Sequence, residues 1–266
     1  MTMVRTPPPP LPVRDKAGTR ALSPMLTRLA EERATGVLFR EHGTLYLAEG
    51  RVVHAESPLA PGLDVLLTAH GTLATTAWQW AAQRSSGPLQ AAELLLESGL
   101  LPAGALELCH LDAVYDAGYF ALAPSSTPGQ FRYDNTPRIG PLPSVPVVAL
   151  ERETLRRRLL LHRLWPDPAA DTAPLIRADP TTGRPVTPRQ RAVLDRVDGV
   201  RTAVVIARNL GRQAFHTLVD VRRLASAGHV APEALVFPQP VLPPPPPVTD
   251  PDIALLKRLR DALEAL

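Results

Sequence analysis

The stretch Thr187–Val230, TPRQRAVLDRVDGVRTAVVIARNLGRQAFHTLVDVRRLASAGHV, has the pattern of three short helices separated by two turns. Thr187 is suited to cap the first helix, because Gln190 stands at the capping-box position three residues later. Gly199 and Gly211 stand where left-handed residues commonly end helices. The stretch therefore predicts a compact three-helix unit.

The third helix of this unit, from about Arg212 to Ala227, is amphipathic. Apolar residues at helical spacing form one face: Ala214, Leu218, Val221 and Ala225. The opposite face is polar: Arg212, His216, Asp220 and Arg223. Three short helices with a basic free side on the last resemble the winged-helix domains of bacterial regulators. We assign this fold to residues 175–237; the resemblance implies contact with double-stranded DNA, although many trihelical domains bind proteins instead.

Six residues of the three-helix unit are candidates for nucleic-acid binding. We expect a groove contact from Arg212, Gln213, His216 and Arg223, and a phosphate contact from Arg189 and Arg201, which lie near helix starts. Residues 151–230 contain 15 basic and 8 acidic residues, a net charge of +7, whereas each flanking part has a net charge of −2. Phosphate contact is a usual reason for such asymmetry. The alternative is a GC-rich genome, since 27 arginines and 2 lysines make up the basic residues.

Composition sets the broad class. A chain of 266 residues can hold two small domains, and its 5% aromatic content predicts cores packed from Leu, Val and Ala. Cys109 is the single cysteine, so no intrachain disulfide can form and a reducing compartment is expected. We find no signal-peptide pattern and no apolar run long enough to span a membrane. These features predict a cytoplasmic protein that does not bind membranes.

The N-terminal half contains three short β-rich runs within GVLFREHGTLYLAEGRVVHAE. They are Gly36–Arg40, Thr44–Ala48 and Arg51–Ala55, and each link between them ends in glycine. Short links of this kind are typical of hairpins, so the runs predict an antiparallel meander. A helix capped by Ser23 should precede it, with Met25, Leu26 and Leu29 facing inward.

A family resemblance is carried by the same segment. A helix, then T-G-V-L, then G-x-L-Y-L-x-E-G-R-V-V-H-A resembles the PatA N-terminal-like (PATAN) domain of bacterial signalling regulators. The matching residues are Thr35 to Leu38, Gly43, Leu45, Tyr46 and Glu49 to Ala55, and G-Q-F-R-Y at 129–133 resembles the closing strand of such domains. The resemblance implies a non-enzymatic interaction module over residues 21–135, in two-component or motility-type signalling. Many members are joined to receiver domains, and this chain shows none.

The remaining segments are linkers and single helices. We expect a disordered leader over 1–20, proline-rich linkers over 136–146 and 238–251, and a connecting helix over 147–165. Residues 21–135 should therefore fold independently of the basic half. The last segment, 252–266, predicts an amphipathic helix with a partner-binding stripe of Leu256, Leu259, Leu263 and Leu266. This helix could dock on a signalling protein, on a second copy in a homodimer, or back onto its own body.

The sequence predicts no enzyme. We find no HExxH, CxxC, GxSxG or phosphate-loop motif, and we expect no catalytic residue, metal or cofactor. Cys109 and His110 are adjacent on a helix and cannot face each other. The predicted fold class is α+β, with a small antiparallel sheet covered by helices plus a mainly α winged-helix-like domain. Our first hypothesis is a signalling adaptor or transcriptional regulator that binds DNA. The alternative is an interaction scaffold in a GTPase or kinase signalling system without DNA binding.

Overall fold

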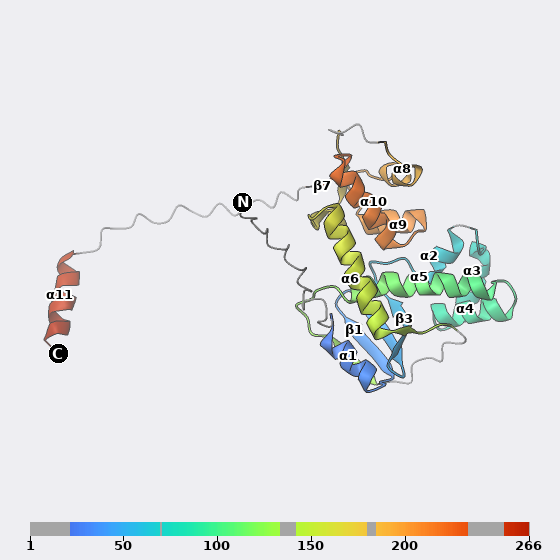
Figure 1. The fold of residues 1–266 in the computed structure, drawn as a ribbon, viewed down its shortest axis with the longest axis horizontal. Coiled ribbons are helices and arrows are strands. Elements are labelled where there is room, and N and C mark those ends of the chain that lie inside the picture. Colours follow the sequence, from blue (N-terminus) through green and yellow to red (C-terminus); the bar gives the residue numbers. More distant parts are fainter. Residues whose placement is uncertain (1–21, 70, 134–141, 180–184, 234–252, 266) are drawn as a thin grey trace, which may run out of the picture. The chain divides into compact units, whose positions relative to one another are not determined.

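The computed structural model describes residues 22–69, 71–133, 142–179, 185–233 and 253–265 (Figure 1). The fold is α+β, as expected. Residues up to Glu233 form one compact unit, and the last helix, α11 (Ile253–Glu264), belongs to a second. The expected leader over 1–20, the linker over 238–251 and the stripe residue Leu266 lie outside the described residues.

The sheet has five strands in the order β4-β1-β2-β3-β5, all antiparallel. The expected meander is confirmed, and the closing strand lies beside β1. The strands are β1 (Gly36–Arg40), β2 (Gly43–Ala48), β3 (Arg51–Glu56), β4 (Gln130–Tyr133) and β5 (Val145–Pro146). Alternate residues of β1 and β2 are buried, as the two-residue period of a half-buried sheet requires.

Helices pack on the buried face of the sheet and beside it. They are α1 (Pro24–Glu31), α2 (Leu63–Thr68), α3 (Thr75–Ala82), α4 (Pro88–Glu97) and α5 (Ala103–Ala121). The long helix α5 contacts β2 and β3, while α2 and α4 form a smaller apolar cluster with its first half. Ser23 caps α1, and Leu26 and Leu29 of this helix are buried, as predicted. Met25 is 37% exposed, so its predicted inward position is wrong.

The helix α6 (Val147–Leu164) has the predicted bounds but a different role. It packs on α1, α5 and α10 (Ala214–Ser226), and β5, at its start, pairs with β3. A Cβ added at Gly118 of α5 would lie 2.7 Å from Leu150 Cδ1, so the two helices are in close contact. The expected linker thus ends inside the sheet, and the expected connecting helix is part of the core.

The predicted three-helix unit is present as α8 (Pro188–Leu194), α9 (Ala203–Leu210) and α10. The Thr187 side chain accepts from the Gln190 backbone N–H, and the Gln190 side chain accepts from the Thr187 N–H, which completes the capping box. Gly211 ends α9 with a left-handed φ of 61°. A short helix, α7 (Ala169–Thr172), and an antiparallel pair, β6 (Leu175–Arg177) with β7 (Val230–Pro232), complete the unit.

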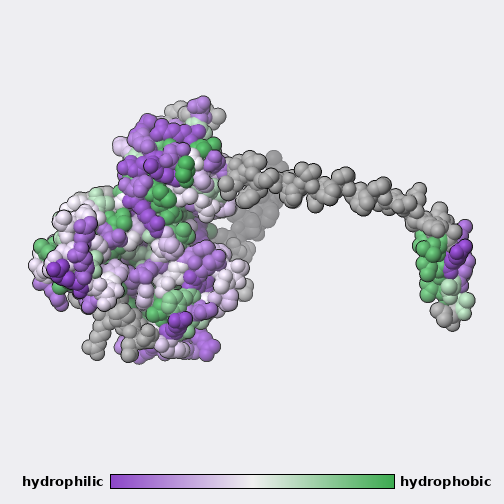
Figure 2. All heavy atoms as spheres, turned by 180° about the vertical axis from the view of Figure 1, so that it is seen from behind, coloured by the Kyte–Doolittle hydropathy of each residue, from purple (hydrophilic) through white to green (hydrophobic). Residues whose placement is uncertain are grey.

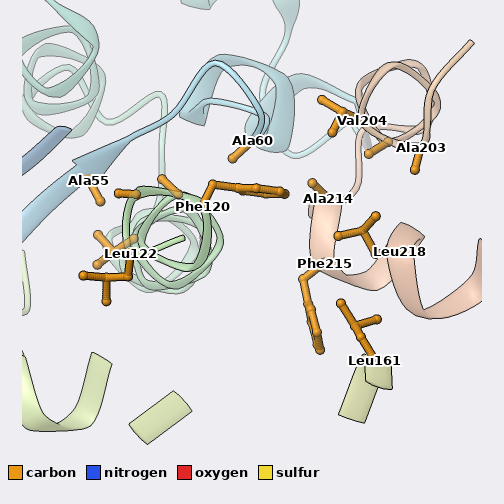
Figure 3. Close-up of a cluster of buried hydrophobic side chains, with 14 of the residues drawn as sticks. Ala55, Ala60, Phe120, Leu122, Leu161, Ala203, Val204, Ala214, Phe215 and Leu218 are labelled. Atoms are coloured by element: carbon orange, nitrogen blue, oxygen red, sulfur yellow. The ribbon is translucent and has the colours of Figure 1, made fainter. Parts of the chain in front are cut away.

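One hydrophobic core joins the sheet to the three-helix unit. It includes Leu38 of β1, Leu161 of α6 and Leu218 of α10. Figure 3 shows Phe120 extending from α5 toward the three-helix unit, and Phe215 of α10 beside Leu161. Because the apolar faces of both parts are buried against each other, the packing does not support independent folding of residues 21–135.

Candidate nucleic-acid interface

Four of the six candidate DNA residues line a single hollow of about 610 Å³: Arg189, Arg212, Gln213 and His216. The opposite wall of this hollow comes from the N-terminal half of the chain. It includes Leu66 of α2 together with Cys109 and Asp112 of α5. The first half of α10 therefore faces two helices of its own chain. A recognition helix needs the opposite, because a duplex must approach it to within hydrogen-bond distance along that half.

The arginines of this hollow are partly neutralised by Asp220. Arg189 Nε lies 2.8 Å from Asp220 Oδ2, and Arg212 Nη1 lies 3.9 Å from the same oxygen. We expected Asp220 on the free face of α10, and this is wrong, because the residue is only 3% exposed. A buried carboxylate needs a charged or hydrogen-bonding partner, and the two arginines provide it.

The N-terminus of α10 is held by a carboxylate from α5. Asp116 Oδ2 accepts from the Ala214 N–H at 2.6 Å, and Oδ1 accepts from the Phe215 N–H at 2.9 Å. Gln213, at the N-cap position, makes no capping bond through its own side chain. Asp116 thus satisfies two free backbone donors and faces the positive end of the helix dipole. This is the end of a recognition helix that normally approaches DNA.

Asp116 is fully buried, and burial raises the pKa of its carboxyl to about 6. The two amide bonds and the Arg157 guanidinium, whose Nη1 lies 3.7 Å from Oδ1, act in the opposite direction and lower that pKa. Arg157 also donates to Glu153 at 2.8 Å and stands 4.5 Å above the Phe215 ring. The contact between α5, α6 and α10 is therefore a buried polar cluster within the apolar core.

Two further contacts hold the three-helix unit against the rest of the body. A Cβ added at Gly211 would lie 1.8 Å from the Cβ of Ala69, so the turn between α9 and α10 packs directly on the end of α2. Arg208 of α9 donates to the Pro58 carbonyl, which follows β3. Both contacts lie at the end of α9 or at the turn after it, next to the N-terminus that a recognition helix places in the major groove.

The remaining two candidates lie elsewhere. Arg201 Nε is 3.4 Å from Asp198 Oδ2, and its Nη1 donates to the Arg196 carbonyl, so its guanidinium is bound locally. Arg223 is exposed on the second half of α10 and lines a separate hollow with His229. The structure therefore brings together four of the predicted residues and leaves these two apart.

The predicted partner-binding stripe is exposed on α11. Leu256 and Leu259 are 53% exposed and Leu263 is 71% exposed. Figure 2 shows hydrophobic residues along one side of α11 and hydrophilic residues along the other. The amphipathic helix predicted for this segment is confirmed over Ile253–Glu264.

Sequence reasoning missed the buried charges that join the parts. Asp116 was visible as a charged residue on the apolar face of α5, which is a signal of a buried, partnered carboxylate. A second such pair is Arg222 with Asp171, joined by two bonds of 2.8 and 2.6 Å, and Arg222 also donates to the Trp165 carbonyl. The sequence has no pattern that pairs these residues, because they are 51 positions apart.

The described residues show a histidine pair that we did not anticipate. His54 of β3 and His110 of α5 stack with ring centroids 5.6 Å apart, and both are buried. Burial lowers the pKa of His110 to about 4, so it is neutral at physiological pH. In the described part of the chain, no group of three or more His, Cys, Asp or Glu residues is arranged to hold a metal ion.

These features define an α+β protein in which a three-helix unit is packed against a sheet-containing part. No protein-family model, curated protein or solved structure matches the chain. Within the described ranges, none of the helices has the length and apolar character that crossing a bilayer requires.

Proposed function

We propose that this chain is a non-enzymatic, cytoplasmic signalling adaptor whose ligands are proteins, and that its three-helix unit is a built-in part of the body. One observation carries this proposal: Asp116 of α5 holds the N-terminus of α10. The PATAN-like sequence pattern of the first half supports the same class. Of the two functions considered from the sequence, the scaffold without DNA binding is thus the better supported.

The environment of α10 supports this choice. A recognition helix inserts its N-terminal residues into a major groove about 12 Å wide. Here that half of α10 lies across a hollow from α2 and α5, and Asp112 adds a negative charge to the opposite wall. A duplex brought to this hollow would meet the helices and would be repelled by the carboxylate.

Duplex binding by the full chain tests the proposal. Fluorescence anisotropy with a labelled pool of random duplexes, at salt concentrations from about 50 to 200 mM, measures both affinity and its salt dependence. We expect weak binding that disappears at the higher salt concentration. Arg212→Gln should leave the duplex affinity unchanged. Tight binding that survives the higher salt and is lost in Arg212→Gln would refute the adaptor proposal.

A positive arm identifies protein ligands. Full-length protein and the double variant Leu259→Asp, Leu263→Asp would each be used to capture proteins from lysate with and without nuclease treatment, and the captured proteins would be quantified by mass spectrometry. The proposal expects specific proteins in the capture. Proteins that bind the body are retained by both forms, and proteins that bind the leucine stripe are lost in the double variant. If nuclease treatment removes every specific partner, nucleic acid is the ligand and the proposal fails.

DNA binding remains a second candidate because the other half of α10 is open. Arg223 is exposed on this half of the helix, and α8, which packs on α10, adds the exposed Arg191. Exposed arginines of this kind can contact a phosphate backbone without inserting the helix N-terminus. This candidate predicts that Arg223→Gln lowers duplex affinity and that the salt slope decreases by about one.

A further inference from the structure

A second hollow lies on the other side of the three-helix unit. It has a volume of about 400 Å³ and is formed by the end of α6, the start of α8 and the end of α10. Its polar lining residues are Arg163, Gln190, Arg223, Ser226 and His229. Its apolar lining residues are Leu164, Pro185, Val186, Leu224 and Ala227. A small-molecule site commonly combines this size with an apolar floor and a few polar groups.

The charge of this hollow is entirely positive. Arg163 and Arg223 line it, and its lining contains no carboxylate. Neither arginine has an ion-pair or hydrogen-bond partner among the described residues. In the first hollow, by contrast, Asp220 and Asp112 balance the two arginines. Two guanidinium groups that share a concave site without a counter-ion favour an anionic ligand.

The Gln190 side chain adds hydrogen-bond donors to this hollow. The Oε1 atom of Gln190 accepts from the Thr187 N–H in the capping box, which leaves its amide N–H groups free of described partners. His229 Nε2 is buried and has no hydrogen-bond partner among the residues that the structure describes. The backbone of His229 is held on both sides: its N–H donates to the Leu224 carbonyl, and its carbonyl accepts from the Ala178 N–H. Buried polar atoms are rarely left without a partner, which marks this nitrogen as a candidate ligand contact.

We propose that this hollow, named here the Arg163–Arg223 pocket, binds a small organic phosphate. The two arginines match the charge and the several oxygens of a phosphate dianion, because a guanidinium can donate two parallel bonds to such a group. The apolar residues would contact the organic part of the ligand. The proposal does not rest on the adaptor function, since it concerns a separate surface.

The same phosphate chemistry could come from a DNA backbone, and the choice of probes separates the two sources. A small organic phosphate can reach the apolar residues of the concave pocket with its organic part. Isothermal titration calorimetry of the full chain would therefore use three probes: inorganic phosphate, glucose 6-phosphate and a random duplex. We expect glucose 6-phosphate to bind most tightly and inorganic phosphate to compete with it.

Variants assign the binding to the pocket. Arg163→Gln and Arg223→Gln should each weaken glucose 6-phosphate binding by about tenfold or more, since each removes a charge-assisted bond. Arg223→Lys should bind with intermediate affinity, because lysine keeps the charge and loses the bidentate geometry. Arg152→Gln is the matched control: it removes an exposed arginine of α6 that does not line the pocket, and it should leave affinity unchanged.

The outcomes separate clearly. Absence of binding by glucose 6-phosphate and inorganic phosphate overturns the proposal, as does an equal loss in Arg152→Gln. Duplex binding that depends on Arg223, with no binding of glucose 6-phosphate, assigns the arginines to a nucleic-acid backbone and also overturns it. Thermal melting of each variant checks folding, and Arg223→Lys keeps the test valid if a glutamine variant is unstable.

Discussion

Replacing Asp116 by alanine tests the contact that holds α10 against α5. The change leaves the Ala214 and Phe215 amides without an acceptor, and each buried unpaired N–H costs about 1–3 kcal/mol. The pKa raised to about 6 shows that the ionised carboxyl is disfavoured at this site even with its partners in place. We therefore expect a net loss at the lower end of the range for two unpaired amides, about 2 kcal/mol at neutral pH.

Urea unfolding gives the free energy, and amide hydrogen exchange locates the effect. Exchange at Ala214 and Phe215 should speed up more than at the middle of α10, because the first turn loses its cap. Asp112→Ala is the matched control, since Asp112 is exposed on the same helix and should change stability by less than about 0.5 kcal/mol. Unchanged stability and unchanged protection of both amides in Asp116→Ala would refute the capping role.

Asp116→Asn separates charge from hydrogen bonding. The folded-state pKa of Asp116 is above its unfolded value, so its stabilising contribution is present below about pH 4 and is lost as pH rises through about 6. Asparagine does not titrate. The stability of Asp116→Asn relative to the unchanged protein should therefore increase across this range, and a constant difference would contradict the assigned pKa.

Four further predictions concern other parts of the molecule. His110 has a folded-state pKa of about 4, below its unfolded value, so the stability that depends on its neutral form should be complete above about pH 6.5. The free energy of unfolding should then fall by up to about 3 kcal/mol toward pH 4. His110→Phe should reduce this pH dependence in an acid titration followed by circular dichroism. Gly211→Ala should destabilise by more than about 1 kcal/mol in urea unfolding, because its Cβ would overlap α2 and its φ is left-handed. A fragment of residues 22–137 lacks α6 and should show no cooperative thermal transition, and a sharp transition would show that the sheet part folds alone. The double change Leu259→Asp, Leu263→Asp should abolish association seen by light scattering. The melting temperature of the body should stay constant, because α11 belongs to a separate unit. A melting temperature lowered by several degrees would instead place the helix on the body.

The local elements of this chain were predictable because their causes are local. The meander follows from short glycine-ending links between β-rich runs, and its strands have the expected bounds within one residue. The capping box at Thr187 and the left-handed Gly211 depend on residues within one turn of each other. The bounds of α6 were also correct, since its apolar period and its flanking prolines mark both ends.

The role of α6 could not be predicted from its own pattern. An amphipathic helix after a proline-rich segment is consistent with a connector, and nothing in its residues specifies which surface its apolar face will cover. In the structure Leu150 fits against Gly118, and a glycine on α5 is what allows that approach. Contacts of this kind depend on two segments that are far apart in sequence.

The sequence by itself determined the α+β class, the order of the strands in the meander, the three-helix unit and the amphipathic last helix, because period, caps and turns act within a few residues. The tertiary structure alone decided which segments α10 contacts. Asp116 and Ala214 are 98 positions apart, and Arg189 reaches Asp220 over 31 positions. A helical pattern shows which residues share a face but not which other segment covers it. Only the packing of α10 on α5 turned a predicted DNA-reading end into a buried, capped one.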